Sequence, residues 1–262
     1  MNSKKSLLYA AVAIICISVG LSIWLSPGTE LTGLRIACND DAAGLLIKYL
    51  AGEDRAALQV ISMSYQQLPD CCSSQTELAL AADYFDLAVL CPDGAEKLLT
   101  SGQPYEVLGT VVVNAKVLVT SQDNVPQTVG YMNAREIQKQ LVWSNLDSGI
   151  VMQPMLPAGL PYALERNAVE GIVLDILGAL KIEGCLTPLP SEYASSVLVV
   201  RRDLMDSPEL AGFIQAYNQA VAEMNRPEIL KIELAKYLAV ENGDNEVEIW
   251  REMGTRYQAM EI

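Results

Sequence analysis

Four cysteines lie close together in the first third of the chain, and a cluster of thiols can bind soft metals. They are Cys38, the adjacent pair Cys71 and Cys72, and Cys91, and each falls where an expected strand ends and a loop begins. Loops that follow strands in an open α/β sheet usually face a ligand. The chain has no histidine. A metal site would therefore rest on sulfur and oxygen, and sulfur selects soft, thiophilic ions.

The cysteines also allow a second interpretation, as structural disulfides. Exported proteins meet an oxidising environment, and Cys38 and Cys91 lie on neighbouring expected strands, within reach of a bridge. The adjacent pair Cys71 and Cys72 can bridge itself only through a strained ring. Cys185 precedes another expected strand away from the cluster and is interpreted as a core or incidental thiol. For the binding interpretation, nearby helix N-termini would lower the thiol pKa and supply thiolate.

The elements that must position these residues alternate between strand and helix. The first part contains expected strands at 34–38, 58–63 and 85–90 and expected helices at 42–50, 76–82 and 95–99. The second part contains expected strands at 107–120 with a turn at Asn114, 128–131, 170–175 and 195–200, a helix at 134–142 capped by Asn133, a loop at 152–162 and a helix from 208 to 225. This order predicts an α/β fold with a mostly parallel sheet.

The N-terminal sequence predicts an export signal. Residues 7–25 are uncharged and mostly apolar behind Lys4 and Lys5, a run close to the roughly 20 residues that span a bilayer. We expect residues 1–30 to form a signal or anchor segment that places the rest outside the cytoplasm. A cleaved signal peptide is an alternative. So is a lipoprotein signal, although the bulky Ile15 before Cys16 argues against it.

Composition excludes several classes of function. The formal net charge is -14, whereas nucleic-acid binding needs clustered Lys and Arg, so no nucleic-acid partner is expected. A thiol oxidoreductase would need a CxxC motif, and other catalysis would need a general acid beside the nucleophile. The chain offers neither CxxC nor histidine. We therefore expect a protein that is not an enzyme and that has no resident cofactor.

Three segments resemble type II periplasmic substrate-binding proteins of ABC transporters, particularly the branch with nitrate, sulfonate and thiamine-precursor binders. They are 84–90 followed by Pro92 and Asp93, 128–131 leading into a helix, and 195–202 followed by the helix that begins at 208. The resemblance implies a periplasmic-binding-protein-like type II fold behind an N-terminal apolar helix. Lobe one would comprise 33–112 plus 200–262 and lobe two 113–199, with a hinge and a cleft between them.

On that mapping the cleft residues come from both lobes. The implied ligand-binding residues are Cys38, Asn39, Asp40, Cys71, Cys72, Cys91 and Asp93 from lobe one, and Tyr131, Met132, Asn133 and Asp175 from lobe two. Cys38, Cys72 and Cys91 would be the metal ligands. The aspartates would balance a cation, although caps and turns also use aspartate. The methionine would add a thioether, although methionine also fills gaps in a core.

The expected cargo departs from that of the branch. Sulfonate and nitrate binders need Arg, Ser or Thr donors, whereas this wall carries thiols and carboxylates. A closer resemblance is to the binding component of a cysteine- and selenocysteine-rich bacterial system that handles organometals, chiefly organomercurials. It implies capture of a soft organometal cation and delivery to ABC permease and ATPase subunits at the membrane. The alternative is a small organic nutrient of the sulfonate or thiamine-precursor type, with the cysteines as disulfides.

Overall fold

The structure, a computed structural model, describes residues 33–52, 63–68, 70, 74–146, 149–189 and 192–261. The predicted N-terminal segment 1–30, with Cys16, and the pair Cys71 and Cys72 lie outside the described residues. Residues 33–262 form one compact unit. In the part of the chain that is described, no helix has the length and apolar character needed to cross a membrane.

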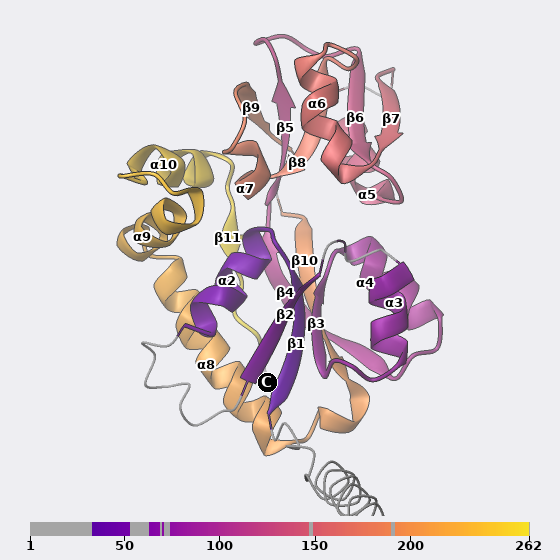
Figure 1. Cartoon of the computed structure of the whole chain (residues 1–262), viewed down its shortest axis with the longest axis vertical. Coiled ribbons are helices and arrows are strands. Elements are labelled where there is room, and N and C mark those ends of the chain that lie inside the picture. The colour runs from indigo at the N-terminus through magenta and orange to yellow at the C-terminus, as the bar shows by residue number, and fades with distance from the viewer. Residues whose placement is uncertain are drawn as a thin grey trace, which may run out of the picture. The chain divides into compact units, whose positions relative to one another are not determined.

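Two sheets organise this unit (Figure 1). The first has the order β11 (Arg256–Tyr257), β4 (Tyr105–Val113), β10 (Ala194–Arg201), β3 (Leu87–Leu90), β1 (Leu34–Asn39) and β2 (Met63–Leu68). The second has the order β7 (Val151–Met155), β6 (Thr128–Met132), β8 (Gly171–Asp175), β5 (Lys116–Thr120) and β9 (Cys185–Pro188). In each sheet three neighbouring strands run parallel, β2-β1-β3 and β7-β6-β8. The expected α/β fold is confirmed, with antiparallel strands added on one side of each parallel set.

Helices cover both faces of the first sheet (Figure 1). The helices of the described residues are α2 (Ala42–Leu50), α3 (Ser74–Ala81), α4 (Pro92–Thr100), α5 (Glu136–Asn145), α6 (Leu160–Glu165), α7 (Ile176–Ala179), α8 (Pro208–Met224), α9 (Pro227–Leu238) and α10 (Asp244–Glu252), with 3-10 turns at Pro157–Gly159 and Arg202–Leu204. On β1, Ile36 packs into a cluster with α2 and α8, and the next residue, Ala37, packs into a cluster with α3 and α4. This alternation of side chains buries β1 and β3 on both faces.

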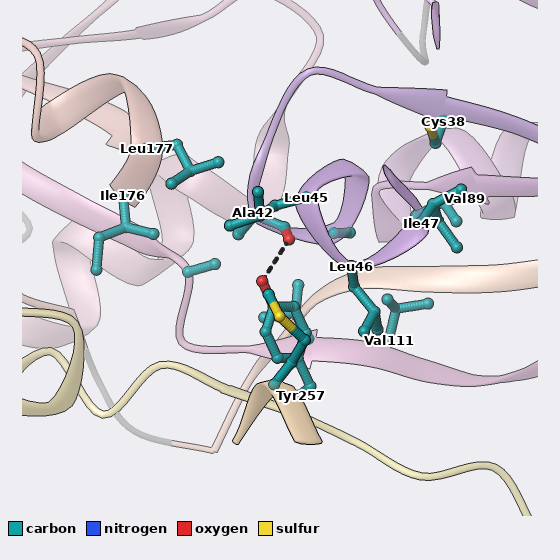
Figure 2. Packing of buried hydrophobic residues seen from close by; sticks show 14 of the residues in the cluster. Cys38, Ala42, Leu45, Leu46, Ile47, Val89, Val111, Ile176, Leu177 and Tyr257 are labelled. Carbon is teal, nitrogen blue, oxygen red and sulfur yellow. Dashed lines mark hydrogen bonds between the residues drawn. The ribbon is translucent and has the colours of Figure 1, made fainter. Parts of the chain in front are cut away.

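The start of α2 is tied to the C-terminal strand of the sheet. Asp41 caps the helix by accepting the N–H of Gly44 at 3.0 Å. The buried Tyr257 of β11 donates its hydroxyl to the carbonyl oxygen of Ala42 at 2.9 Å, as Figure 2 shows. A Cβ at Gly44 would stand 1.8 Å from the carbonyl oxygen of Asn39. Only glycine lets the helix begin this close to the end of β1.

The chain crosses between the sheets at two adjacent places, from β4 to β5 and from β9 to β10. Asn114, with a φ of 55°, donates its N–H to the carbonyl of Tyr193 and accepts the N–H of Tyr193 on its side chain, at 3.2 and 3.3 Å. The Tyr193 hydroxyl accepts the N–H of Lys116 and donates to the carbonyl of the same residue. Ser195 accepts the N–H of Ala115 at 2.8 Å. The two crossings are therefore bonded to each other, and the turn expected at Asn114 is confirmed.

Three local predictions differ from the structure. The expected strand at 58–63 meets strand β2 (Met63–Leu68) only at Met63, and residues 58–62 lie outside the described residues; the polar sequence of β2 lacks alternation because it is an edge strand with Ser64 through Gln67 exposed. The predicted loop at 152–162 begins within strand β7. This strand lies at the edge of the second sheet, where Pro154 is tolerated because an edge strand can leave an N–H position unpaired. Asn133 does not cap α5, because that helix begins at Glu136 after Arg135.

Candidate functional site

The parallel strands of the two sheets end beside one another, and polar contacts join their ends. We call these strand ends the facing edges; they comprise residues 38–42, 70, 91–93, 131–138 and 175. The backbone N–H of Ala42, after β1, donates to Asp175, the last residue of β8. Asp70, after β2, binds Arg135, which follows β6. Carboxyl ends of parallel strands are where open α/β sheets bind ligands. The facing edges are therefore the candidate site.

Asp175 has three partners at the facing edges. Its Oδ1 accepts the N–H of Leu177 at 3.1 Å, as the cap of α7, and the N–H of Ala42 at 3.0 Å. Its Oδ2 accepts from the ammonium of Lys116 at 3.0 Å. Burial opposes the charge of Lys116, but Asp175 and then Asp41 hold the lysine pKa above its ordinary value. Asp175 thus joins the two sheets, and its role toward a ligand stays a prediction.

The N-terminus of α5, with Arg135 just before it, binds two carboxylates that follow strands of the first sheet. Asp70 accepts from the guanidinium of Arg135, whose side chain is only 5% exposed. Asp93, in the first turn of α4, lies 3.4 Å from the backbone nitrogen of Ile137, a long and weak hydrogen bond. Asp70 is itself held by Thr76, which donates its hydroxyl to the Asp70 carbonyl at 2.7 Å. A buried guanidinium requires such a counter-ion.

Cys38 and Cys91 belong to different sides of the first sheet. Cys38 is fully buried in the cluster that contains Val89 and α2, as Figure 2 shows. Cys91 is buried in the cluster on the other face, with Ala37 and Ala95. Cys38 carries a free thiol, so the structure contains no Cys38–Cys91 bridge. Alternation along the strands therefore keeps these two sulfurs apart.

The two thiols also differ in their electrostatic surroundings. Burial raises the pKa of Cys38 to about 12, and the charge of Asp41 adds to the rise. The expectation of a thiolate near neutral pH is therefore wrong for Cys38, because desolvation outweighs the nearby helix N-terminus. Cys91 is the N-cap of α4, and its Sγ accepts the N–H of Gly94 at 3.2 Å. The sulfur of Cys91 thus lies at the N-terminus of α4 as a hydrogen-bond acceptor, whereas the thiol of Cys38 lies in an apolar cluster.

The other predicted residues of the first sheet lie at its edge. Asn39 is half-buried at the end of β1, and its Oδ1 is buried without a hydrogen-bond partner in the described residues. Asp40 is exposed and pairs with the ammonium of Lys48 at 2.6 Å. Partial burial favours the neutral acid, but the Lys48 hydrogen bond and charge lower the pKa of Asp40 overall. Asp40 thus has a partner on α2 and is available to solvent.

Three of the predicted residues, Tyr131, Met132 and Asn133, lie at the end of β6. Tyr131 is buried, and Met132 is half-buried at the strand end. Asn133 is exposed and donates its N–H to the carbonyl of Met155, at the end of β7, at 2.9 Å. The contact brings a second methionine to the same strand ends.

A metal centre is not complete within the described residues. No group of three or more Cys, Asp or Glu side chains in the described ranges is placed to hold an ion. The predicted metal set of Cys38, Cys72 and Cys91 includes Cys72, which lies outside those ranges. The metal assignment therefore stays a prediction.

Sequence reasoning missed Arg135 and Gln138 as residues of the facing edges. Gln138 is 3% exposed, and its Oε1 accepts the N–H of Met132 at 3.0 Å. Its Nε2 is buried without a hydrogen-bond partner in the part of the chain that is described. The available signal was weak: Gln138 stands four residues before the buried Val142, on the inward stripe of α5, where an apolar residue is normal.

No protein-family model matches the chain, and no curated protein matches it. Solved structures do match. The alkanesulfonate-binding protein SsuA from Xanthomonas axonopodis pv. citri, bound to MOPS, is 17% identical with a TM-score of 0.64, over 87% of this chain and 86% of that one. The ligand-binding component of an ABC-type import system from Staphylococcus aureus, with zinc bound, is 15% identical with a TM-score of 0.63, over 88% and 87%.

A nutrient-binding protein from Burkholderia cenocepacia, bound to methionine, is 15% identical with a TM-score of 0.56, over 74% of this chain and 95% of that one. At these identities the likeness concerns the fold. The chain has the periplasmic-binding-protein-like fold. The fold class that the sequence resemblance implied is confirmed. In a periplasmic-binding-protein-like fold, the facing edges correspond to the general ligand position of open α/β sheets.

Proposed function

We propose that the chain is the substrate-binding component of an ABC importer, that it works outside the cytoplasm, and that it delivers cargo to permease and ATPase subunits. The observation that carries this is the meeting of two sets of parallel strand ends, joined by polar contacts at Asp175 and Arg135. Structures of similar fold are described as binding proteins and as the ligand-binding component of an import system. No step of this function requires catalysis.

We propose that the two sheets act as two lobes that close on cargo. The sequence placed lobe one at 33–112 plus 200–262 and lobe two at 113–199. The bonded crossings around Asn114 support a hinge at the first boundary. Because β10 pairs with β3 and β4, strand pairing supports moving the second boundary to a position before Ala194. Closure then follows from cargo binding the closed state more tightly than the open one.

We propose that the cargo is a soft, thiophilic compound, such as an organomercurial cation, bound by Cys91 and Cys72. The support is the position of Cys91 at the facing edges and at the N-terminus of α4. Cys72 precedes α3 in the sequence. Cys38 is a weaker candidate because its thiol is buried and protonated at neutral pH. A small organic nutrient remains the alternative cargo.

A methylmercury titration of the full chain in detergent, with excess glutathione as competitor, tests this proposal. We expect retention of one methylmercury against glutathione, a higher melting temperature and a smaller radius of gyration in solution scattering. Cys91→Ser and Cys72→Ser should each abolish retention. The matched control is Cys185→Ser, since Cys185 is a half-exposed free thiol on β9. Retention that survives Cys91→Ser and Cys72→Ser would refute the cargo assignment.

The importer function has a separate readout. A binding protein of this kind should contract when some cargo binds, whichever cargo that is. If an extract of small molecules changes neither the melting temperature nor the radius of gyration of the full chain, the importer proposal fails as well. If an organic nutrient causes both changes while methylmercury causes neither, the importer proposal stands and the alternative cargo replaces the soft one.

A further inference from the structure

The first turn of α5 presents hydrogen-bond donors at the facing edges. Arg135 precedes the helix with a guanidinium that is almost fully buried, and no side chain caps the helix N-terminus. The backbone N–H of Ile137 makes a long contact to Asp93. A helix N-terminus and a guanidinium both favour negative charge. This patch therefore suits an anionic group, whereas the thiols and carboxylates that follow the strands of the first sheet suit a cation.

Gln138 adds an independent observation to this patch. In an amide side chain only the oxygen can accept a hydrogen bond. The 3.0 Å bond from the N–H of Met132 therefore identifies Oε1 of Gln138 and leaves its Nε2 as a donor. That NH2 group lies at the end of β6, because its own amide is bonded there. It is buried, and it donates to no group in the described ranges. A buried donor without an acceptor is costly, and binding sites are where such groups persist.

The partner that Arg135 binds in the structure indicates the matching chemistry. It is a carboxylate, that of Asp70, and the fork of a guanidinium suits planar oxyanions. Gln138 lies one turn from Arg135, and its backbone N–H donates to the Arg135 carbonyl at 3.2 Å. We infer that Gln138 is a cargo-binding residue, whose Nε2 donates to a carboxylate of the cargo beside the positive charge of Arg135. The inference rests on the proposed importer function and adds a chemical class to its cargo.

Matched pairs of ligands test this, because each pair differs at the carboxylate. The first pair is 4-hydroxymercuribenzoate and phenylmercury, which share the soft metal. The second pair is L-methionine and L-methioninamide, which share the thioether. Affinity is measured for the full chain in detergent, by calorimetry for the methionine pair and by glutathione competition for the mercurials. The carboxylate member of at least one pair should bind about ten- to a hundredfold more tightly, as expected for a hydrogen bond to a charged group.

Two variants and a control place the effect on Gln138. Gln138→Leu removes the amide, whereas Gln138→Glu keeps an acceptor for the N–H of Met132 but replaces the donor with a negative charge. Both should abolish the preference for the carboxylate member. Gln140→Leu, an exposed change on the same helix, should leave it intact. Melting temperatures confirm that each variant is folded, and Gln138→Glu keeps the test valid if Gln138→Leu unfolds.

Three results would overturn the inference that Gln138 binds a carboxylate of the cargo. Equal binding of both members of each pair would refute the carboxylate while leaving the importer function standing. A preference that survives both Gln138 variants would refute the role of Gln138. If no member of either pair binds the wild-type chain, the inference fails. The importer function is then judged by its own contraction assay, so that the two failures can be told apart.

Discussion

The buried pair of Asp175 and Lys116 offers the sharpest test of the electrostatics at the facing edges, because it joins the ends of β8 and β5 within the second sheet. Its side chains are 16% and 13% exposed, so both charges are largely removed from water. Asp175→Asn keeps the size of the side chain and one oxygen that can still accept the N–H groups of Leu177 and Ala42. It removes the counter-charge of Lys116. The perturbation therefore isolates the ion pair from the helix cap.

We expect Asp175→Asn to lower the free energy of unfolding by about 3 kcal/mol, the lower end for breaking a buried pair. The lower end applies because Asp41 also stabilises the Lys116 charge and remains in place. For a chain of this size such a loss corresponds to a fall in melting temperature of about 6–12 °C. The measurement is urea unfolding at pH 7, with thermal melting as a second readout.

The pH dependence of this loss has a definite sign. In the wild type the pKa of Lys116 is raised, so its stabilisation is complete below the ordinary lysine value of 10.5 and is lost only at higher pH. Without Asp175, burial should lower the pKa of Lys116, so the variant gains stability as the pH rises toward that value. The gap between wild type and Asp175→Asn should therefore narrow from pH 7 to pH 10.

A double-mutant cycle decides whether the pair is the cause. Lys116→Met removes the buried charge, so the double variant should be more stable than Asp175→Asn alone. Additive losses, or a gap that stays constant with pH, would refute the reasoning. The matched control is Glu136→Gln, which breaks an exposed pair with Lys139. Such a pair contributes about 0.3–0.5 kcal/mol.

Three further outcomes are expected. Cys38 has a buried thiol with a pKa raised to about 12, so it should resist alkylation at pH 8 in the folded chain; rapid labelling measured by mass spectrometry would contradict this resistance. Because the unfolded chain loses the Cys38 proton first, the free energy of unfolding should fall as the pH rises above the ordinary cysteine value of 9.0. Tyr257→Phe should cost about 1–2 kcal/mol in urea unfolding, because it leaves the buried carbonyl of Ala42 without this donor. Gly44→Ala should displace the start of α2 from the carbonyl of Asn39 and lower the melting temperature more than Tyr257→Phe does. An unchanged melting temperature would show that the close approach of the helix to Asn39 is not required.

Local pattern was enough for the elements that bury an apolar face. The run at 42–50 behind Asp41 predicts the helix that the structure contains, and the turn at Asn114 separates two apolar strands as expected. Pattern failed where a strand is at the edge of a sheet, because both faces of β2 meet solvent and no alternation is needed. The start of α5 was misplaced because Asn133 is used by a backbone bond to Met155 rather than by the helix.

The candidate site divides in the same way between sequence and tertiary structure. The sequence by itself determined that the chain has no histidine and predicted that Cys38, Cys91 and Asp175 lie at the ends of strands, because composition and local pattern are properties of the chain order alone. Only the tertiary structure decided that Cys38 and Cys91 pack on opposite faces of one sheet. It alone brings Arg135 to Asp70, across 65 residues. The physical reason is that burial and ion pairing depend on which groups meet in space, and a local pattern carries no record of its distant partners.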